Sequence, residues 1–101
     1  MIYLLAVPGP IEEVEEVRVL EWHGPEGHAF SAGELVVELE THKALVEVRA
    51  GQTGVLRRIV CMEGAWQDVG KTLAVFSDAP AEPMPDSWSE LAAWAVEFEV
   101  S

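Results

Sequence analysis

Basic side chains are scarce in this chain of 101 residues. Only 6 lysines and arginines accompany 18 aspartates and glutamates, so the formal net charge is -12. This charge repels phosphate backbones and anionic lipid surfaces, which argues against nucleic acid and membranes as partners. A partner steered by electrostatics would present a basic face, and its attraction would weaken as the salt concentration rises.

Cysteine and long apolar runs are scarce as well. The single Cys61 excludes an internal disulfide and has no metal-ligand spacing around it, so we expect a small core residue in a reducing, cytoplasmic setting. No segment approaches the ~18 uninterrupted apolar residues of a membrane span. The apolar start, MIYLLAV, has no basic n-region and ends at Pro8-Gly9-Pro10, short of the ~15 residues or more of a signal peptide.

The histidines are too few and too scattered to indicate a metal site. His23 and His28 flank Gly24-Pro25, His42 is distant, and no thiol or carboxylate cluster matches them at ligand spacing. The carboxylates of residues 11–16, IEEVEE, could do acid-base work only beside a pocket or partner groups, so an exposed acidic loop and strand edge is the simpler interpretation. The sequence therefore predicts neither a metal site nor catalytic residues.

What the chain does contain is enough apolar residues for one modest core, and an internal repeat. Half of its residues are apolar. Residues 17–40, VRVLEWHGPEGHAFSAGELVVELE, align without a gap on residues 54–77, GVLRRIVCMEGAWQDVGKTLAVFS. In each copy a strand-like run meets Glu-Gly, a short polar stretch follows, and a second glycine opens another strand-like run. The pattern predicts a small all-β sandwich or flattened barrel that uses one supersecondary unit twice.

The stretch 38–48, ELETHKALVEV, indicates a β-hairpin with Lys43, one of only two lysines, at its tip. Apolar residues alternate with acidic ones on both sides of the tip, which is the period of a half-buried strand. Thr41 and His42 suit a turn, since histidine is among the few non-glycine residues enriched in left-handed backbone conformations. The same alternation points Leu45 outward beside the lysine.

The composition changes after Ser77, where we expect the domain of residues 1–77 to end. Residues 78–87, DAPAEPMPDS, form a proline-rich linker, and residues 88–101 form a short C-terminal tail. Ser87 and Glu90 match a capping box. In a short helix beginning there, one face would carry four residues, namely Trp88, Leu91, Ala92 and Ala95. Residues 96–100, VEFEV, alternate instead like a strand.

The four tryptophans divide into two pairs. Trp22 and Trp66 fall in the two repeat units, and we expect both to pack in or near the core. Trp88 and Trp94 lie in the tail, where three interpretations stay open. The tail could fold back over the domain, dock on a second copy to form a homodimer, or bind a partner enzyme.

The motifs together resemble those of the biotinyl/lipoyl carrier domains. The resemblance covers residues 2–77 with the pattern V-x-E-W…E-G…G-E-L-x-x-E-L-E-T-x-K-A-x-V-E-V…G-x-x-x-x-I…E-G…V-G-K-x-L-A. The tip, ETHKA, is close to the Glu-Thr-Asp-Lys-Ala of lipoyl domains, whereas biotinyl domains typically carry Met-Lys-Met. The resemblance implies a barrel-sandwich hybrid: two small antiparallel sheets related by a quasi-two-fold axis, with the modified lysine at a hairpin tip.

The resemblance also implies a cofactor and a recognition segment. Lys43 would be amidated by lipoate through a separate lipoate-attaching enzyme, which would recognise Glu40, Thr41, His42 and Ala44. Glu40 occupies the place of a glutamate that helps this enzyme choose its target. His42 stands where aspartate is usual.

By this resemblance the chain is a carrier and not an enzyme. It would be a stand-alone lipoyl carrier protein that shuttles an acyl or aminomethyl group between dehydrogenase-type enzymes of a 2-oxo acid dehydrogenase or a glycine-cleavage-like system. A tethered arm delivers its group at high effective concentration. One alternative is a biotinyl carrier for carboxyl transfer, although methionine flanks Lys43 on neither side. Another is an unmodified protein-binding module of the same fold.

Overall fold

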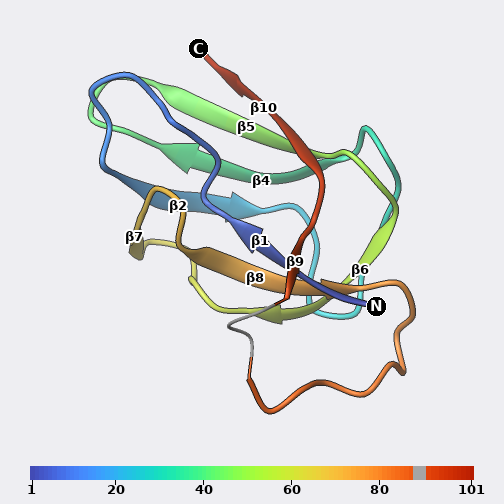
Figure 1. Cartoon of the computed structure of the whole chain (residues 1–101). Coiled ribbons are helices and arrows are strands. Elements are labelled where there is room, and N and C mark those ends of the chain that lie inside the picture. The colour runs from blue at the N-terminus through green and yellow to red at the C-terminus, as the bar shows by residue number, and fades with distance from the viewer. Residues whose placement is uncertain (88–90) are drawn as a thin grey trace.

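Short runs of alternating apolar residues form ten strands in the described residues, 1–87 and 91–101, of the computed structural model (Figure 1). The strands build two five-stranded sheets that pack face to face and do not close into a barrel. The predicted all-β class and two-sheet sandwich are therefore confirmed. No helix of the described chain is long and apolar enough to cross a membrane.

The first sheet has the order β3-β6-β8-β1-β9 and the second the order β10-β5-β4-β2-β7. The strands of the first sheet are β3 (Ala29–Phe30), β6 (Gly54–Ile59), β8 (Thr72–Ser77), β1 (Ile2–Ala6) and β9 (Ala92–Ala93). Those of the second are β10 (Val96–Val100), β5 (Leu45–Ala50), β4 (Leu35–Glu40), β2 (Glu16–Trp22) and β7 (Trp66–Asp68). Neighbouring strands are antiparallel except for β9, which runs parallel to β1.

The internal repeat appears as a reciprocal exchange between the two copies. The first copy forms β2, β3 and β4, and the second forms β6, β7 and β8. The short strand of each copy pairs with the first strand of the other, because β3 pairs with β6 and β7 pairs with β2. The repeated glycines, Gly27 with Gly64 and Gly33 with Gly70, all have φ values between 88° and 97°, a backbone region that favours glycine.

The repeated Glu-Gly motif also acts across the copies. The backbone N–H of Trp22 donates to Glu63 Oε2 at 2.9 Å, and that of Ile59 donates to Glu26 Oε2 at 2.8 Å. Each glutamate therefore accepts a hydrogen bond from a strand end of the other copy, where the N–H would otherwise lack a ladder partner. This exchange gives the quasi-two-fold arrangement its physical basis.

The core confirms two of the burial predictions and corrects a third. Cys61 is buried, which raises the pKa of its thiol, and its carbonyl accepts a 3.0 Å hydrogen bond from Nε1 of the buried Trp22. Trp66 was expected in or near the core, but it is 52% exposed. It opens β7, a three-residue strand at the sheet edge, and its equivalent in the first copy, Ala29, is exposed too.

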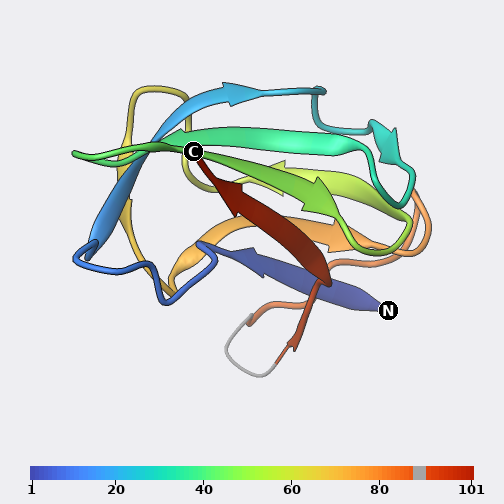
Figure 2. The same cartoon turned by 90° about the horizontal axis from the view of Figure 1, so that it is seen from above.

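The tail crosses from one sheet to the other and corrects the predicted helix. Ala92 belongs to β9, which pairs with β1, and residues 96–100 form β10 along β5, so the strand expectation is confirmed there (Figure 2). The edges of β1 and β5 supply hydrogen-bond partners for the backbone of the tail. A short helix would lose these partners and would have to satisfy its backbone groups internally. The expected capping box depends on Glu90, and both Glu90 and Trp88 lie outside the described residues.

Trp94 fixes the tail between the two sheets. Its ring is 3% exposed and stacks on Phe76, with centroids 3.8 Å apart and an interplanar angle of 7°. Of the three interpretations of the tail, folding back over the domain is the one that this packing supports. The C-terminal end then lies beside the β4–β5 turn, where the N–H of Ser101 donates to the carbonyl of Leu45 at 2.9 Å.

Candidate functional site

The β4–β5 hairpin places Lys43 at its tip, as predicted from the alternation. The strands pair in antiparallel register up to Glu40 and Leu45, which leaves residues 41–44 as the turn. The hydroxyl of Thr41 organises this turn: Oγ1 accepts hydrogen bonds from the backbone N–H groups of Lys43, at 3.0 Å, and Ala44, at 2.8 Å. Thr41 itself is buried. His42 does not adopt the left-handed backbone conformation that would suit a turn. Glu13 is the one described non-glycine residue with a positive φ.

The buried hydroxyl makes Thr41 the residue on which the turn depends. Replacing Thr41 by valine is expected to lower the free energy of unfolding by about 1–3 kcal/mol, because the N–H groups of Lys43 and Ala44 lose their acceptor. Chemical denaturation measures this loss. Thr41→Ser keeps the hydroxyl and should retain most of the stability. A loss of stability in the serine variant without one in the valine variant would show that the methyl group, and not the hydroxyl, matters.

Lys43 is accessible at the tip. Its side chain is 49% exposed and forms an ion pair with Glu13 of the β1–β2 loop, whose side chain is 62% exposed. Exposed pairs of this kind contribute about 1 kcal/mol or less, so the contact leaves the amine within reach of another protein. Sequence reasoning missed Glu13, because the loop and the hairpin meet only in the folded chain.

The residues around Lys43 divide into outward and inward side chains. His42 is exposed, Glu40 is partly exposed with Arg18 Nη1 3.9 Å from its carboxylate, and Leu45 points outward as expected. Ala44 is half-buried and Thr41 faces inward. The structure thus brings all five residues of ETHKA together at one tip, while the recognition role of Glu40, Thr41, His42 and Ala44 stays a prediction.

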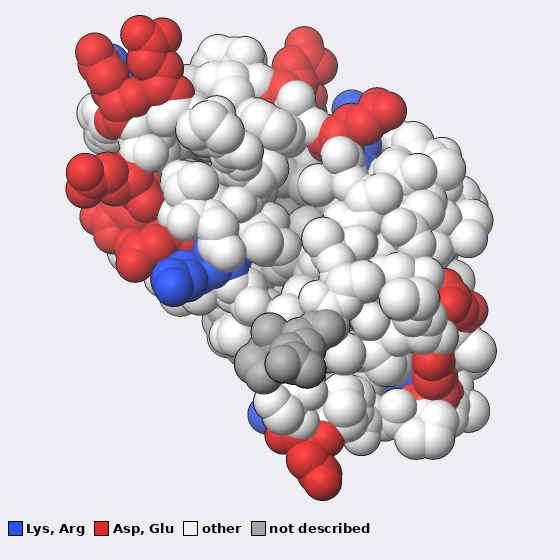
Figure 3. All heavy atoms as spheres, in the orientation of Figure 1, with Lys and Arg blue, Asp and Glu red and all other residues white. Residues whose placement is uncertain are grey.

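An acidic hollow lies on one side of the tip. It has a volume of about 570 Å³ and is lined by Glu13, Val14, Glu15, Glu16, His42 and Trp66. The glutamates of residues 11–16 are exposed, which confirms the interpretation of this stretch as an acidic loop and strand edge. Figure 3 shows acidic side chains around the margin of the face that it displays, and a largely uncharged centre.

A second hollow, the Lys43 groove, lies between the β1–β2 loop and β10 and has a volume of about 300 Å³. It is lined by Pro10, Ile11, Glu12, Val14, Thr41, Lys43, Ala44, Phe98 and Val100. The alternation in residues 96–100 predicted a strand but gave no partner for it. Pairing of β10 with β5 is what brings Phe98 and Val100 to the tip.

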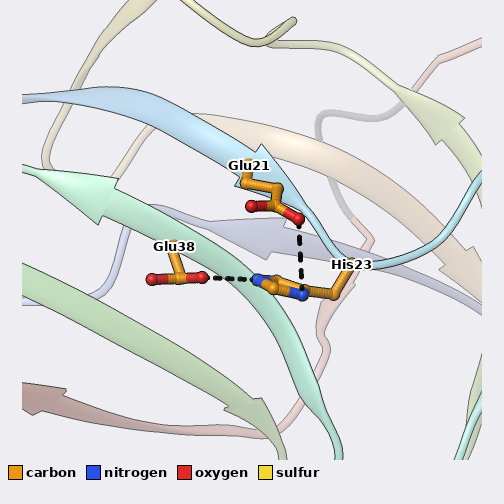
Figure 4. Close-up of side chains that lie close together, drawn as sticks. All are labelled: Glu21, His23 and Glu38. Carbon is orange, nitrogen blue, oxygen red and sulfur yellow. Dashed lines mark hydrogen bonds and ion pairs between the residues drawn. The ribbon is translucent and has the colours of Figure 1, made fainter.

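A histidine lies between two carboxylates elsewhere on the second sheet (Figure 4). Glu21 of β2 pairs in register with Glu38 of β4, and His23 follows β2. The Nε2 atom of His23 lies 2.7 Å from Glu38 Oε1, and its Nδ1 lies 3.9 Å from Glu21 Oε2. The expectation that no carboxylates match the histidines was wrong, because strand pairing supplies them.

This group is arranged as a hydrogen-bonded histidine. The two carboxylates lie at different nitrogens of one ring, whereas metal ligands direct one atom each toward a common ion. One ligand atom from each of the three residues nevertheless lies within 4.8 Å of the others. The expected absence of a metal site stays a prediction.

Comparison with known proteins gives consistent matches across the body of the chain. The family model Biotin_lipoyl, described as "Biotin-requiring enzyme", matches residues 4–76. The dihydrolipoyllysine-residue succinyltransferase component of the 2-oxoglutarate dehydrogenase complex of Staphylococcus saprophyticus is 37% identical over 84 residues, which is 75% of this chain and 20% of that protein. The protein of the same description from Bacillus subtilis is 30% identical over 89 residues, or 85% of this chain and 21% of that protein.

A mitochondrial relative has a different description. The pyruvate dehydrogenase complex protein X component of Chaetomium thermophilum is 33% identical over 73 residues, which is 71% of this chain and 16% of that protein. The chain therefore spans about a fifth of the length of the curated relatives that it matches.

Proposed function

Since the chain belongs to the biotinyl/lipoyl carrier domain family, whose domains carry a group and are not catalytic, we propose that it carries lipoate as an amide on Lys43. The observation that supports this most directly is the position of Lys43, half exposed at the tip of the β4–β5 turn within ETHKA. The arrangement fits an attached group, because an exposed ion pair with Glu13 is the one contact that holds Nζ within residues 1–87 and 91–101.

The chain's own residues present the amine and do no chemistry on the cargo. Thr41 holds the backbone of Lys43 in the turn, so the side chain leaves the domain from a defined point. An ammonium group is not a nucleophile, so the attaching enzyme must displace Glu13 and remove a proton from Nζ before the amide forms. Bound lipoate would supply a dithiolane that can take up an acyl group, while amide formation removes the positive charge of Lys43.

Two observations favour lipoate over biotin. His42 and Ala44 flank Lys43, where biotinyl domains typically carry methionines. The relatives from Staphylococcus saprophyticus and Bacillus subtilis are described by a dihydrolipoyllysine residue, and the names of the relatives refer to 2-oxoglutarate and pyruvate dehydrogenase complexes. We therefore place the carrier in a 2-oxo acid dehydrogenase system. The acidic hollow beside the tip suits a partner enzyme with a basic face.

Mass spectrometry tests the proposed function. The chain is incubated with ATP, lipoate and a lipoate ligase, or with biotin and a biotin ligase, and the products are digested and sequenced. We expect a lipoyl adduct on Lys43 and no biotinyl adduct. An unmodified lysine in both reactions would favour the binding-module alternative, and a biotinyl adduct alone would favour the biotinyl carrier.

His42 offers a test of recognition within the tip. His42→Asp restores the aspartate typical of lipoyl domains and is expected to raise the lipoylation rate roughly fivefold, the factor that corresponds to one charged contact of ~1 kcal/mol. The rate is measured by the time course of adduct formation under limiting ligase. His42→Ala is the control, because it removes the imidazole ring without adding a carboxylate. Identical rates in all three proteins would show that position 42 does not influence recognition.

A further inference from the structure

The Lys43 groove is apolar although it lies at the tip of an acidic protein. Six of the nine lining residues are apolar, namely Pro10, Ile11, Val14, Ala44, Phe98 and Val100. Phe98 is 41% exposed and Val100 is 46% exposed, so both leave apolar surface in contact with water. Covering such surface is favourable, in proportion to the area removed from water.

The wall formed by the tail is a feature of this chain outside the matched family segment. Phe98 and Val100 lie on β10, whereas the family match ends at residue 76. The strand is fixed at this place by its pairing with β5, where Phe98 lies opposite Val48 and Val100 opposite Val46. The groove therefore exists because the tail adds an edge strand to the sheet that carries the hairpin.

The apolar lining of the groove and the position of Lys43 indicate which molecule occupies it. Lys43 is itself a lining residue, so a chain attached to Nζ begins beside the groove and samples it at the high effective concentration of a tethered ligand. Amide formation removes the charge of Nζ and its ion pair with Glu13, and leaves an aliphatic chain. A neutral aliphatic chain matches an apolar lining, whereas a free lysine ammonium does not.

We propose that the Lys43 groove holds the lipoyl arm in a resting position against Phe98 and Val100, so that the C-terminal strand controls how often the dithiolane is exposed. This inference rests on the proposed function. The volume of about 300 Å³ is at the small end of the range for ligand pockets, which suits a single slender chain. A partner enzyme would draw the arm out by offering it a deeper site, and the groove would hold the arm between such encounters.

The experiment uses the lipoylated full chain, with the adduct on Lys43 first verified by mass spectrometry. Nuclear Overhauser effects are recorded between the Phe98 ring and the methylenes of the arm, at two protein concentrations. In parallel, the rate of dithiolane reduction by a water-soluble phosphine is measured for the wild type, Phe98→Thr and Val100→Thr. Threonine keeps the β-propensity of these strand positions. Val60→Thr is the matched control, since Val60 is exposed but does not line the groove.

We expect concentration-independent contacts between Phe98 and the arm, and reduction that is roughly threefold to tenfold faster in Phe98→Thr and Val100→Thr, as for an arm docked for most of the time in the wild type. The Val60→Thr control should match the wild type. Absence of contacts together with equal rates in all proteins would overturn the resting groove while leaving the lipoyl carrier intact. Contacts that vanish on dilution would assign the groove to a second copy. Absence of any adduct on Lys43 would overturn the proposed function itself.

Discussion

Replacing Lys43 by arginine is expected to abolish lipoylation completely while leaving the domain folded. The guanidinium of arginine stays protonated at all physiological pH values, so it cannot attack an activated lipoyl group as an amine does. Lys43 is half exposed and contacts Glu13 only through an exposed ion pair, which arginine can preserve. The free energy of unfolding should therefore change by less than about 0.5 kcal/mol.

Lys71→Arg is the matched control for this variant. Lys71 is the other lysine of the chain and is also exposed, but it precedes β8 and lies outside ETHKA. Intact-protein mass spectrometry after the ligase reaction should show the adduct in Lys71→Arg and none in Lys43→Arg. An adduct on Lys43→Arg would move the modification site to Lys71. Unfolding of Lys43→Arg would contradict the exposed position of Lys43.

Trp94→Ala is expected to lower the free energy of unfolding by about 3–5 kcal/mol, the usual loss when a buried tryptophan is truncated. Its ring stacks on the fully buried Phe76, and a Cβ built on Gly54 would lie 2.6 Å from its Nε1, so the ring packs directly against the first sheet. Among the described residues Nε1 has no hydrogen-bond partner. The stabilisation therefore comes from apolar packing, and Trp94→Phe should retain a large part of it.

Trp66→Ala is the control for Trp94→Ala. Trp66 is 52% exposed, so its truncation should cost less than about 1 kcal/mol. Urea denaturation of the three variants and the wild type gives the comparison. Equal losses in Trp94→Ala and Trp66→Ala would mean that the tail does not pack against the sheets.

Features encoded by local periodicity could be predicted from the sequence. The alternation around ETHKA placed Lys43 at a hairpin tip, and the repeated Glu-Gly and second glycines marked the same turns in both copies. Burial of Trp22 followed from its place in the repeat, and burial of Cys61 followed from its lack of a disulfide or metal-ligand partner. These features depend on the residue types themselves, on residues close in sequence, or on a repeat that can be recognised by aligning the sequence with itself.

Features that depend on contacts between distant segments could not be predicted in this way. The spacing of residues 88–95 favoured a helix, yet β9 forms there because the edge of β1 offers backbone partners. Glu13 and the Lys43 groove arise from a loop, a hairpin and the tail meeting at one end of the sandwich. His23 meets Glu38 only through the register of β2 and β4. In each case tertiary pairing overrides or adds to the local signal.

The reciprocal exchange of short strands and glutamates means that the domain is, in effect, a dimer contained in one chain. Each copy completes its partner, so a peptide with one copy alone would keep an unpaired strand edge and would need a second molecule to cover it. The segment that joins the copies, residues 41–53, converts this encounter into an intramolecular one. The same segment carries Lys43, so the position that bears the cargo is also the covalent junction that keeps both halves folding as one cooperative unit.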